Sequence, residues 1–245
     1  MRVRMHMAAC VGAVVSAAAL AGCSSVDPAA RAALDSAFAR IAAAKTVSFT
    51  VSEIGDAESA SPAGGAVLHY RLRRPDRLLC RAGEGSAAAV LAFDAGRLTV
   101  VRPDRKQYVE FADAAADTDA LVRTLALRYG VSLPLAELLL GRHADDPVSR
   151  LTSARATGGE TVAGTPCRRF AYSTETEDFE VWFAAEAPEL PRKVAIVRRD
   201  SPGSPRFAAR LSDWTLDGPL PDAELAAPTA GMTRVEPGAL RLGRR

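Results

Sequence analysis

Apolar and polar residues alternate along most of this chain, and a period of two predicts a largely antiparallel β protein. Val47, Phe49 and Val51 alternate with Ser and Thr, which is typical of a strand with one buried face. The same pattern predicts strands at 68–73, 77–81, 87–93, 97–101 and 107–111, then at 151–157, 160–163, 167–174, 178–184, 192–199 and 206–216. Turns are expected at Asp94-Ala95-Gly96 and at Gly158-Gly159.

A helix is predicted before the first strand. Asp27-Pro28 is typical of an N-cap followed by the first helical residue. Leu34, Phe38 and Ile41 then follow at helical spacing and form one apolar stripe. This helix is expected to pack on the sheet.

The middle of the chain predicts a second helical region. Thr118 is a candidate N-cap for a helix that ends at Gly130. Pro134 would open a second, leucine-rich helix that ends at Gly141. A helix this apolar is either buried or covers an apolar space, so a helical lid is expected at about 118–141.

Together these elements predict an α+β fold with mostly antiparallel β structure. A sheet with this many strands curls or splits, so the expected architecture is an open, unclosed, curled β-barrel of about 11 strands, covered by the N-terminal helix and the central lid. One domain is expected at 28–236, followed by a disordered basic tail at 237–245.

The N-terminus carries a targeting signal. Arg2 and Arg4 precede an uncharged run of 13 residues, from Ala8 to Leu20, which is too short to span a bilayer and fits a secretory signal. Leu20-Ala21-Gly22-Cys23 resembles the lipobox of bacterial lipoproteins. The resemblance implies cleavage of residues 1–22, lipidation of Cys23 and a tether at 23–27. The alternative is an ordinary signal peptide in which Cys23 is incidental.

This signal changes the charge balance and predicts the location. The chain has 31 Lys and Arg against 29 Asp and Glu, and its first 22 residues hold two Arg and no acid, so the mature chain would be balanced. A neutral chain with 6% aromatic residues gives no basis for binding nucleic acid. The expected location is extracytoplasmic and lipid-anchored. By the sorting rule of enteric bacteria, Ser24 favours the outer membrane in a host with two membranes.

Two cysteines stay unassigned once Cys10 and Cys23 are set aside. Cys80 and Cys167 would lie in a compartment that permits disulfides. A bridge between them would close a long loop and stabilise the fold by roughly 4–5 kcal/mol in the chain-entropy model. The alternative is two buried free thiols, because Cys packs well as a small apolar residue.

No catalytic motif is present. The sequence has no Gly-x-Ser-x-Gly, phosphate-binding loop or His-Glu-x-x-His. His69 and His143 have no carboxylate or thiol at metal-ligand spacing. The acidic run from Glu175 to Glu180 is expected to be a solvated hairpin tip. No metal, no cofactor and no enzymatic activity are therefore predicted.

Arginines recur on the outward positions of several predicted strands. They are expected either on a solvated face or in contact with anionic lipid head groups, where each is worth about 1 kcal/mol. The residues are Arg71, Arg73, Arg74, Arg77, Arg81, Arg168, Arg169, Arg198 and Arg199.

The inward positions form the candidate ligand site. A half-barrel holds more inward surface than one short lid fills, which leaves room for an acyl chain. For each such residue alone plain core is the better interpretation, and the ligand site is inferred from the set. The candidate lining residues are Val47, Phe49, Val51, Leu68, Tyr70, Leu72, Leu135, Leu138, Leu139, Phe179, Val181 and Phe183.

The layout resembles the LolA/LolB lipoprotein-carrier superfamily, and more closely a family of predicted periplasmic proteins of unknown function assigned to it. The resemblance covers about residues 47–235. It rests on the stretches 93–96, 101–103, 107–108, 129–130, 133–135, 162–167, 190–193 and 212–214, together with Trp182. The sequence departs from the expected pattern at Ala95, where Gly is usual, and at Arg168. These motifs are structural rather than catalytic.

The resemblance implies a membrane-anchored, non-enzymatic lipoprotein that binds a lipid or a lipoprotein acyl chain. A tethered barrel cannot shuttle freely, so the LolB end of the superfamily is the closer expectation. The alternative is a structural or regulatory envelope module whose groove is filled by its own side chains and whose partner is an envelope protein.

Overall fold

The structure is a computed structural model that describes residues 25–53, 67–129, 131, 133–140, 148–200 and 206–239. Its strands are β1 Thr46–Glu53, β2 Val67–Arg73, β3 Arg77–Ala82, β4 Ala89–Asp94, β5 Arg97–Arg102, β6 Gln107–Phe111, β7 Ser153–Val162, β8 Thr165–Ser173, β9 Glu177–Ala184, β10 Pro191–Arg198, β11 Arg206–Leu216 and β12 Thr233–Arg234. The helices are α1 Pro28–Ala43 and α2 Thr118–Tyr129, and the 3₁₀ turns are η1 Gly85–Ala87, η2 Pro103–Arg105, η3 Ala136–Leu139, η4 Asp222–Glu224 and η5 Pro237–Ala239.

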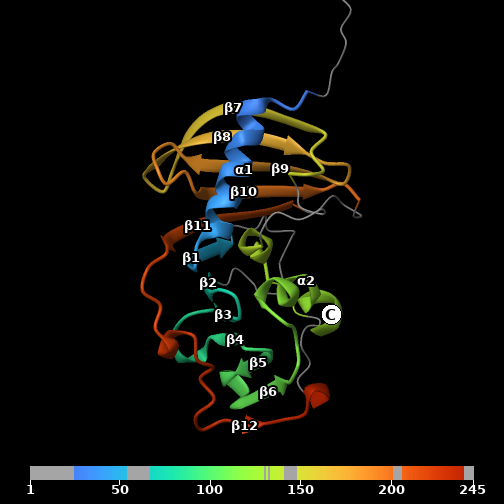
Figure 1. The fold of residues 1–245 in the computed structure, drawn as a ribbon, viewed down its shortest axis with the longest axis vertical. Coiled ribbons are helices and arrows are strands. Elements are labelled where there is room, and N and C mark those ends of the chain that lie inside the picture. Colours follow the sequence, from blue (N-terminus) through green and yellow to red (C-terminus); the bar gives the residue numbers. More distant parts are fainter. Residues whose placement is uncertain are drawn as a thin grey trace, which may run out of the picture.

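All the described strands belong to one sheet of 12 strands, in the order β12-β6-β5-β4-β3-β2-β1-β11-β10-β9-β8-β7. Every pair is antiparallel except β12 with β6, which is parallel. β1 and β11 join two meanders at the middle of the sheet, with Val47 opposite Leu216. The strands follow one another along the long axis and the sheet does not close on itself (Figure 1). The expected open, mostly antiparallel fold is confirmed.

One turn prediction was wrong, and one strand was not predicted. Gly158-Gly159 is not a turn but lies within β7, where a register shift between Ala156 and Gly158 marks a bulge. The backbone at Gly158 has a φ of +113°, a conformation that glycine adopts at the bulge and that other residues rarely adopt. The sequence also gave no signal for β12, whose two residues pair with Gln107 and Tyr108.

α1 forms as predicted and lies across the β7–β11 half of the sheet (Figure 1). The Asp27 carboxylate accepts the Ala29 N–H at 2.8 Å and caps the helix. α2 lies beside the other half, but its cap is Asp117, whose carboxylate accepts the Ala120 N–H at 2.7 Å. Among the described residues, no helix is both long and apolar enough to cross a membrane.

The predicted second lid helix was wrong. Pro134 and Leu135 form a turn, and only η3 follows, a single short 3₁₀ segment. Leu135 precedes it in the left-handed conformation, with a φ of +61°, which is incompatible with an α-helix that continues from Pro134. Gly130 and Gly141, the predicted helix ends, lie outside the described residues.

Residues near both predicted domain boundaries have defined structure. Val26 forms a parallel bridge with Ala154 of β7, and the Asp27 N–H donates to the Ala154 carbonyl at 2.9 Å. The end of the expected tether at 23–27 is therefore bound to the sheet edge. At the other end Pro237–Ala239 form the short 3₁₀ turn η5. Cys23, the rest of the signal and residues 240–245 lie outside the described residues.

The main core lies between the concave face of the sheet and the helices. Phe38 and Ile41 of α1, Leu121 of α2 and Leu139 of η3 belong to one buried cluster with the inward residues of the strands. A second cluster lies on the outer face, where Leu225 is buried against Leu79, Val90, Ala92 and Val101. The segment after β11 therefore covers the outside of β3–β5.

Candidate functional site

The twelve candidate lining residues do come together. Ten of them are buried in the core cluster, and Leu135 and Leu138 are partly buried and pack against it. Phe49 lies between Tyr70 and Trp214, with ring centroids 4.8 and 4.3 Å apart and nearly parallel planes. These side chains therefore fill the concave face, and none of them lines either of the two pockets described below.

Two tyrosines of the sheet hold the cover in place. The Tyr70 hydroxyl donates to the Pro134 carbonyl at 2.7 Å, and the Tyr172 hydroxyl donates to the Ala30 carbonyl at 2.9 Å. Burial, then the neighbouring Cys80, raises the pKa of Tyr70, so this phenol stays a neutral donor. One tyrosine fixes the lid segment and the other fixes α1.

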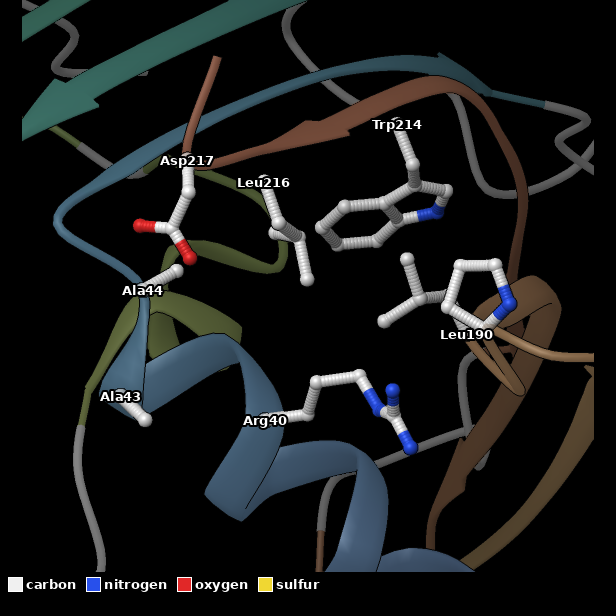
Figure 2. A pocket seen from close by; sticks show the side chains of 8 residues that line it. Arg40, Ala43, Ala44, Leu190, Trp214, Leu216 and Asp217 are labelled. Carbon is white, nitrogen blue, oxygen red and sulfur yellow. The ribbon is translucent and has the colours of Figure 1, made fainter.

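An open pocket of about 400 Å³ lies beside this core, at the C-terminal end of α1. Arg40, Ala43 and Ala44 come from the end of α1, Pro188 and Leu190 from the β9–β10 connection, and Trp214, Leu216 and Asp217 from the end of β11. Figure 2 shows Trp214 and Arg40 on opposite sides of the pocket, with Leu190 between them and Leu216 beside Trp214. The volume is in the range of small-ligand sites.

A bulge places Trp214 at this pocket. Ser48 pairs with Thr215 but Thr50 pairs with Ser212, so two residues of β11, Asp213 and Trp214, lie opposite one of β1. Asp213 takes a φ of +55°. The Trp214 indole N–H donates to the Pro191 carbonyl at 2.8 Å, which fixes the ring against the β9–β10 connection.

A second pocket of about 300 Å³ shares Pro188, Leu190 and Trp214 with the first. It is completed by Thr165, Pro166, Ala184, Glu186, Ala187 and Arg192. Because the two pockets share three walls, we treat them as one groove, called the Trp214 groove below.

The Trp214 groove is not apparent from the sequence, where Trp214 and residues 190–193 stand out only as parts of structural motifs. The alternation of β11 cannot show where an extra residue will turn a side chain inward, because a bulge depends on the pairing with β1. The available signal in the sequence for this groove was the pair of prolines Pro188 and Pro191 together with Trp214.

The predicted disulfide was wrong, since Cys80 and Cys167 are both buried free thiols. Cys80 lies in the concave core, whereas Cys167 lies in a separate cluster with Val162 and Trp182. Five strands separate β3 from β8 in the sheet, while bridged Cα atoms are about 4.4–6.8 Å apart. Burial raises the pKa of Cys80 to about 12.

His69 has partners that the sequence did not reveal. Its Nδ1 lies 3.2 Å from the Thr50 hydroxyl and its Nε2 lies 3.4 Å from the Glu84 carboxylate. Glu84 reaches it because the β3–β4 turn folds beside β2. The Glu84 side chain is 75% exposed. Thr50, His69 and Glu84 line neither of the two pockets. His143 lies outside the described residues.

Most of the arginines predicted to face outward are paired with acids rather than left for a lipid surface, and one of them, Arg74, instead contacts the covering helices. Partner oxygens lie within 4.0 Å of Arg71, Arg73, Arg74, Arg77, Arg168, Arg169, Arg198 and Arg199. Glu177, Asp178 and Glu180 of the acidic run are among these partners, so that run is not a purely solvated tip. Pairing weakens the case for head-group contact on this face.

A comparison with protein families identifies the chain. Residues 30–236 match the model of a family described as "Predicted periplasmic protein (DUF2092)". The chain belongs to this family. It is the family that the motifs of the sequence resemble, and its description agrees with the expected periplasmic location. A comparison with curated proteins gives no match.

Several solved structures are similar to this DUF2092 member at low sequence identity. LprF from Mycobacterium bovis has a TM-score of 0.52 at 12% identity, with 83% of this chain and 99% of that chain covered. The Mycobacterium tuberculosis lipoprotein LppX has a TM-score of 0.47 at 14% identity, covering 80% and 98%. A LolA superfamily protein from Nitrosomonas europaea has 0.37 at 9%, covering 81% and 97%. The likeness to LprF shows a shared fold, and at this sequence identity it shows nothing beyond the fold.

Proposed function

We propose that this protein is a lipid-anchored envelope lipoprotein that binds the acyl chain of a lipid or lipoprotein, without catalysis, in the Trp214 groove. The observation that supports binding is the pocket of about 400 Å³ walled by Trp214, Leu190 and Leu216. Burial of hydrocarbon at about 25 cal/mol per Å² would drive binding. The lipobox at Leu20–Cys23 supports the anchor, which would hold the protein at the periplasmic side of the outer membrane in a host with two membranes.

Filling the pocket tests the binding. Ala43 is exposed and lines it, so Ala43→Phe should displace a ligand without disturbing the core. Ala32→Phe is the matched control, because Ala32 is exposed on the same helix and outside the groove. We expect the wild type and Ala32→Phe to bind a fluorescent fatty acid and Ala43→Phe to bind about 10-fold more weakly. Native mass spectrometry of detergent-free protein should show co-purifying lipid. No uptake and no lipid would overturn the proposal.

The anchor has a test of its own. The mass of the mature N-terminus should correspond to cleavage after Gly22 with acyl chains on Cys23, and Cys23→Ser should release the protein from the membrane fraction. An unmodified Cys23 in the mature protein would contradict it.

A second function is favoured by the packing of the concave face. Because the inward residues fill that face with their own side chains, the domain also suits a structural or regulatory module that docks on an envelope protein. Crosslinking in cells separates the two functions. One stoichiometric protein partner with no bound lipid supports the module and contradicts lipid binding.

A further inference from the structure

The Trp214 groove has a charged side chain at its opening. Arg40 belongs to the last turn of α1 and is exposed. Among the described residues its guanidinium has no ion-pair or hydrogen-bond partner, in contrast to Arg31 on the same helix, which pairs with Asp35 at 3.6 Å. Figure 2 shows the Arg40 side chain extending along the rim of the pocket toward Leu190. Its donors are therefore available to a molecule in the pocket.

The acid that lines the same pocket, Asp217, has a main-chain partner. Its carboxylate accepts the Lys45 N–H at 2.7 Å. Figure 2 shows that carboxylate on the Ala44 side, across the pocket from Trp214. The other acid of the groove, Glu186, lies in the second pocket with Arg192. The first pocket therefore presents a cation at its mouth that no carboxylate binds directly.

The end of α1 does not repel an anion as strongly as a bare helix end would. Its last carbonyls carry partial negative charge. Arg74 donates to two of them, Ala44 at 3.2 Å and Ile41 at 3.5 Å. The positive charge of Arg74 therefore offsets the partial negative charge at the end of α1. Arg40 is not needed for that role and can bind an anion in the pocket.

We propose that the ligand is an anionic amphiphile. Its acyl chain lies against Trp214, Leu190 and Leu216, and its carboxylate or phosphate accepts hydrogen bonds from Arg40. A charge-assisted bond of this kind favours an acid over a neutral group of the same size. The inference rests on the proposed acyl-chain binding and adds the chemistry of the head group.

Three ligands with the same chain length test it on the full mature protein. Palmitate carries a carboxylate, palmitoyl lysophosphatidic acid carries a phosphate, and hexadecanol carries no charge. Each competes with a neutral fluorescent acyl probe. We expect at least one anion to bind about 10-fold more tightly than hexadecanol, and the tighter of the two identifies the head group. Arg40→Gln should remove the preference by weakening the binding of the anions more than that of hexadecanol. Arg31→Gln, with the same change in net charge on the same helix, should retain it.

The outcomes separate this inference from the proposed function. If all three ligands bind the wild type equally, the role of Arg40 is wrong while acyl-chain binding stands. If Arg31→Gln lowers anion binding as much as Arg40→Gln does, the effect is general charge and the inference is also wrong. If no ligand binds at all, the proposed function fails and this inference fails with it.

Discussion

The guanidinium of Arg74 donates to the main-chain oxygen of Leu139 across 2.6 Å, and this contact fixes η3 to the end of β2. The same side chain reaches the carbonyls of Ile41 and Ala44 and the carboxylate of Asp119 at 3.2 Å. One residue therefore joins α1, α2 and η3 to the sheet.

Replacing Arg74 should loosen all three covering elements. Arg74→Met keeps the aliphatic stem but leaves three carbonyls without this donor, so we expect a loss of about 2–4 kcal/mol in the free energy of unfolding. Urea unfolding measures it, and amide exchange should rise at 136–140. Arg71→Met is the control, because Arg71 is 40% exposed and pairs only on the outer surface. A loss no larger than that of the control would contradict the role given to Arg74.

Ala95→Gly should stabilise the protein. Ala95 takes a φ of +45° in the β4–β5 turn, where a side chain is strained and glycine is not. The departure noted at Ala95 in the sequence therefore has a physical cost. We expect a gain of about 0.5–1 kcal/mol in thermal or urea unfolding. Ala171→Gly, within β8, should instead destabilise; an equal gain there would show that the turn is not the cause.

Acid should weaken the β8–β9 hairpin through Asp178. Hydrogen bonds from Arg199 and from Ser173, the latter at 2.7 Å, hold the pKa of the Asp178 carboxyl below its usual value. A lowered pKa means that the folded state favours the ionised form. The stability it contributes is complete above the unfolded value of about 4 and is lost as pH falls through the folded pKa.

Asp178→Asn should therefore lower stability at pH 7 and flatten its decline below pH 4. Unfolding measured from pH 2 to 7 checks this, with Glu175→Gln as the control because Glu175 makes no ion pair among the described residues. A variant with the same pH profile as the wild type would be evidence against this assignment.

The two domain thiols should resist modification until the protein unfolds. Burial raises the pKa of Cys80 to about 12 and also raises that of Cys167, so both stay protonated at pH 8 and lie out of reach. Iodoacetamide should label neither in the native protein and both in denaturant without reductant. If the two thiols were labelled in denaturant only after reduction, Cys80 and Cys167 would be joined by a disulfide, contrary to this prediction.

The sequence was most informative where local patterns decide the structure. Alternation located the strands, and Asp27-Pro28 located the start of α1, because a strand face and a helix cap are each set by a few neighbouring residues. Apolar residues are continuous rather than alternating at Leu78–Cys80 and Val90–Phe93. The reason is that the segment around Leu225 covers the outer face of these strands, so both of their faces are buried.

The sequence was least informative where distant segments decide. The bulge that turns Trp214 inward depends on β1, and the pairing of β12 depends on β6. The Trp214 groove combines the ends of α1 and β11 with the β9–β10 connection, so no single stretch could reveal it. The lid was overestimated because four leucines suggested a helix, whereas Leu135 adopts a turn conformation.

The pairing of β1 with β11 also has a consequence for the order in which the protein can fold. During synthesis β1 to β6 and then β7 to β10 emerge beside their own neighbours, but the centre of the sheet stays open until β11 is made. Pairing between such distant segments is slow, and the waiting edges can recruit other chains. A chain that ends before β11 would therefore hold two unjoined meanders prone to aggregation, and not a smaller working domain.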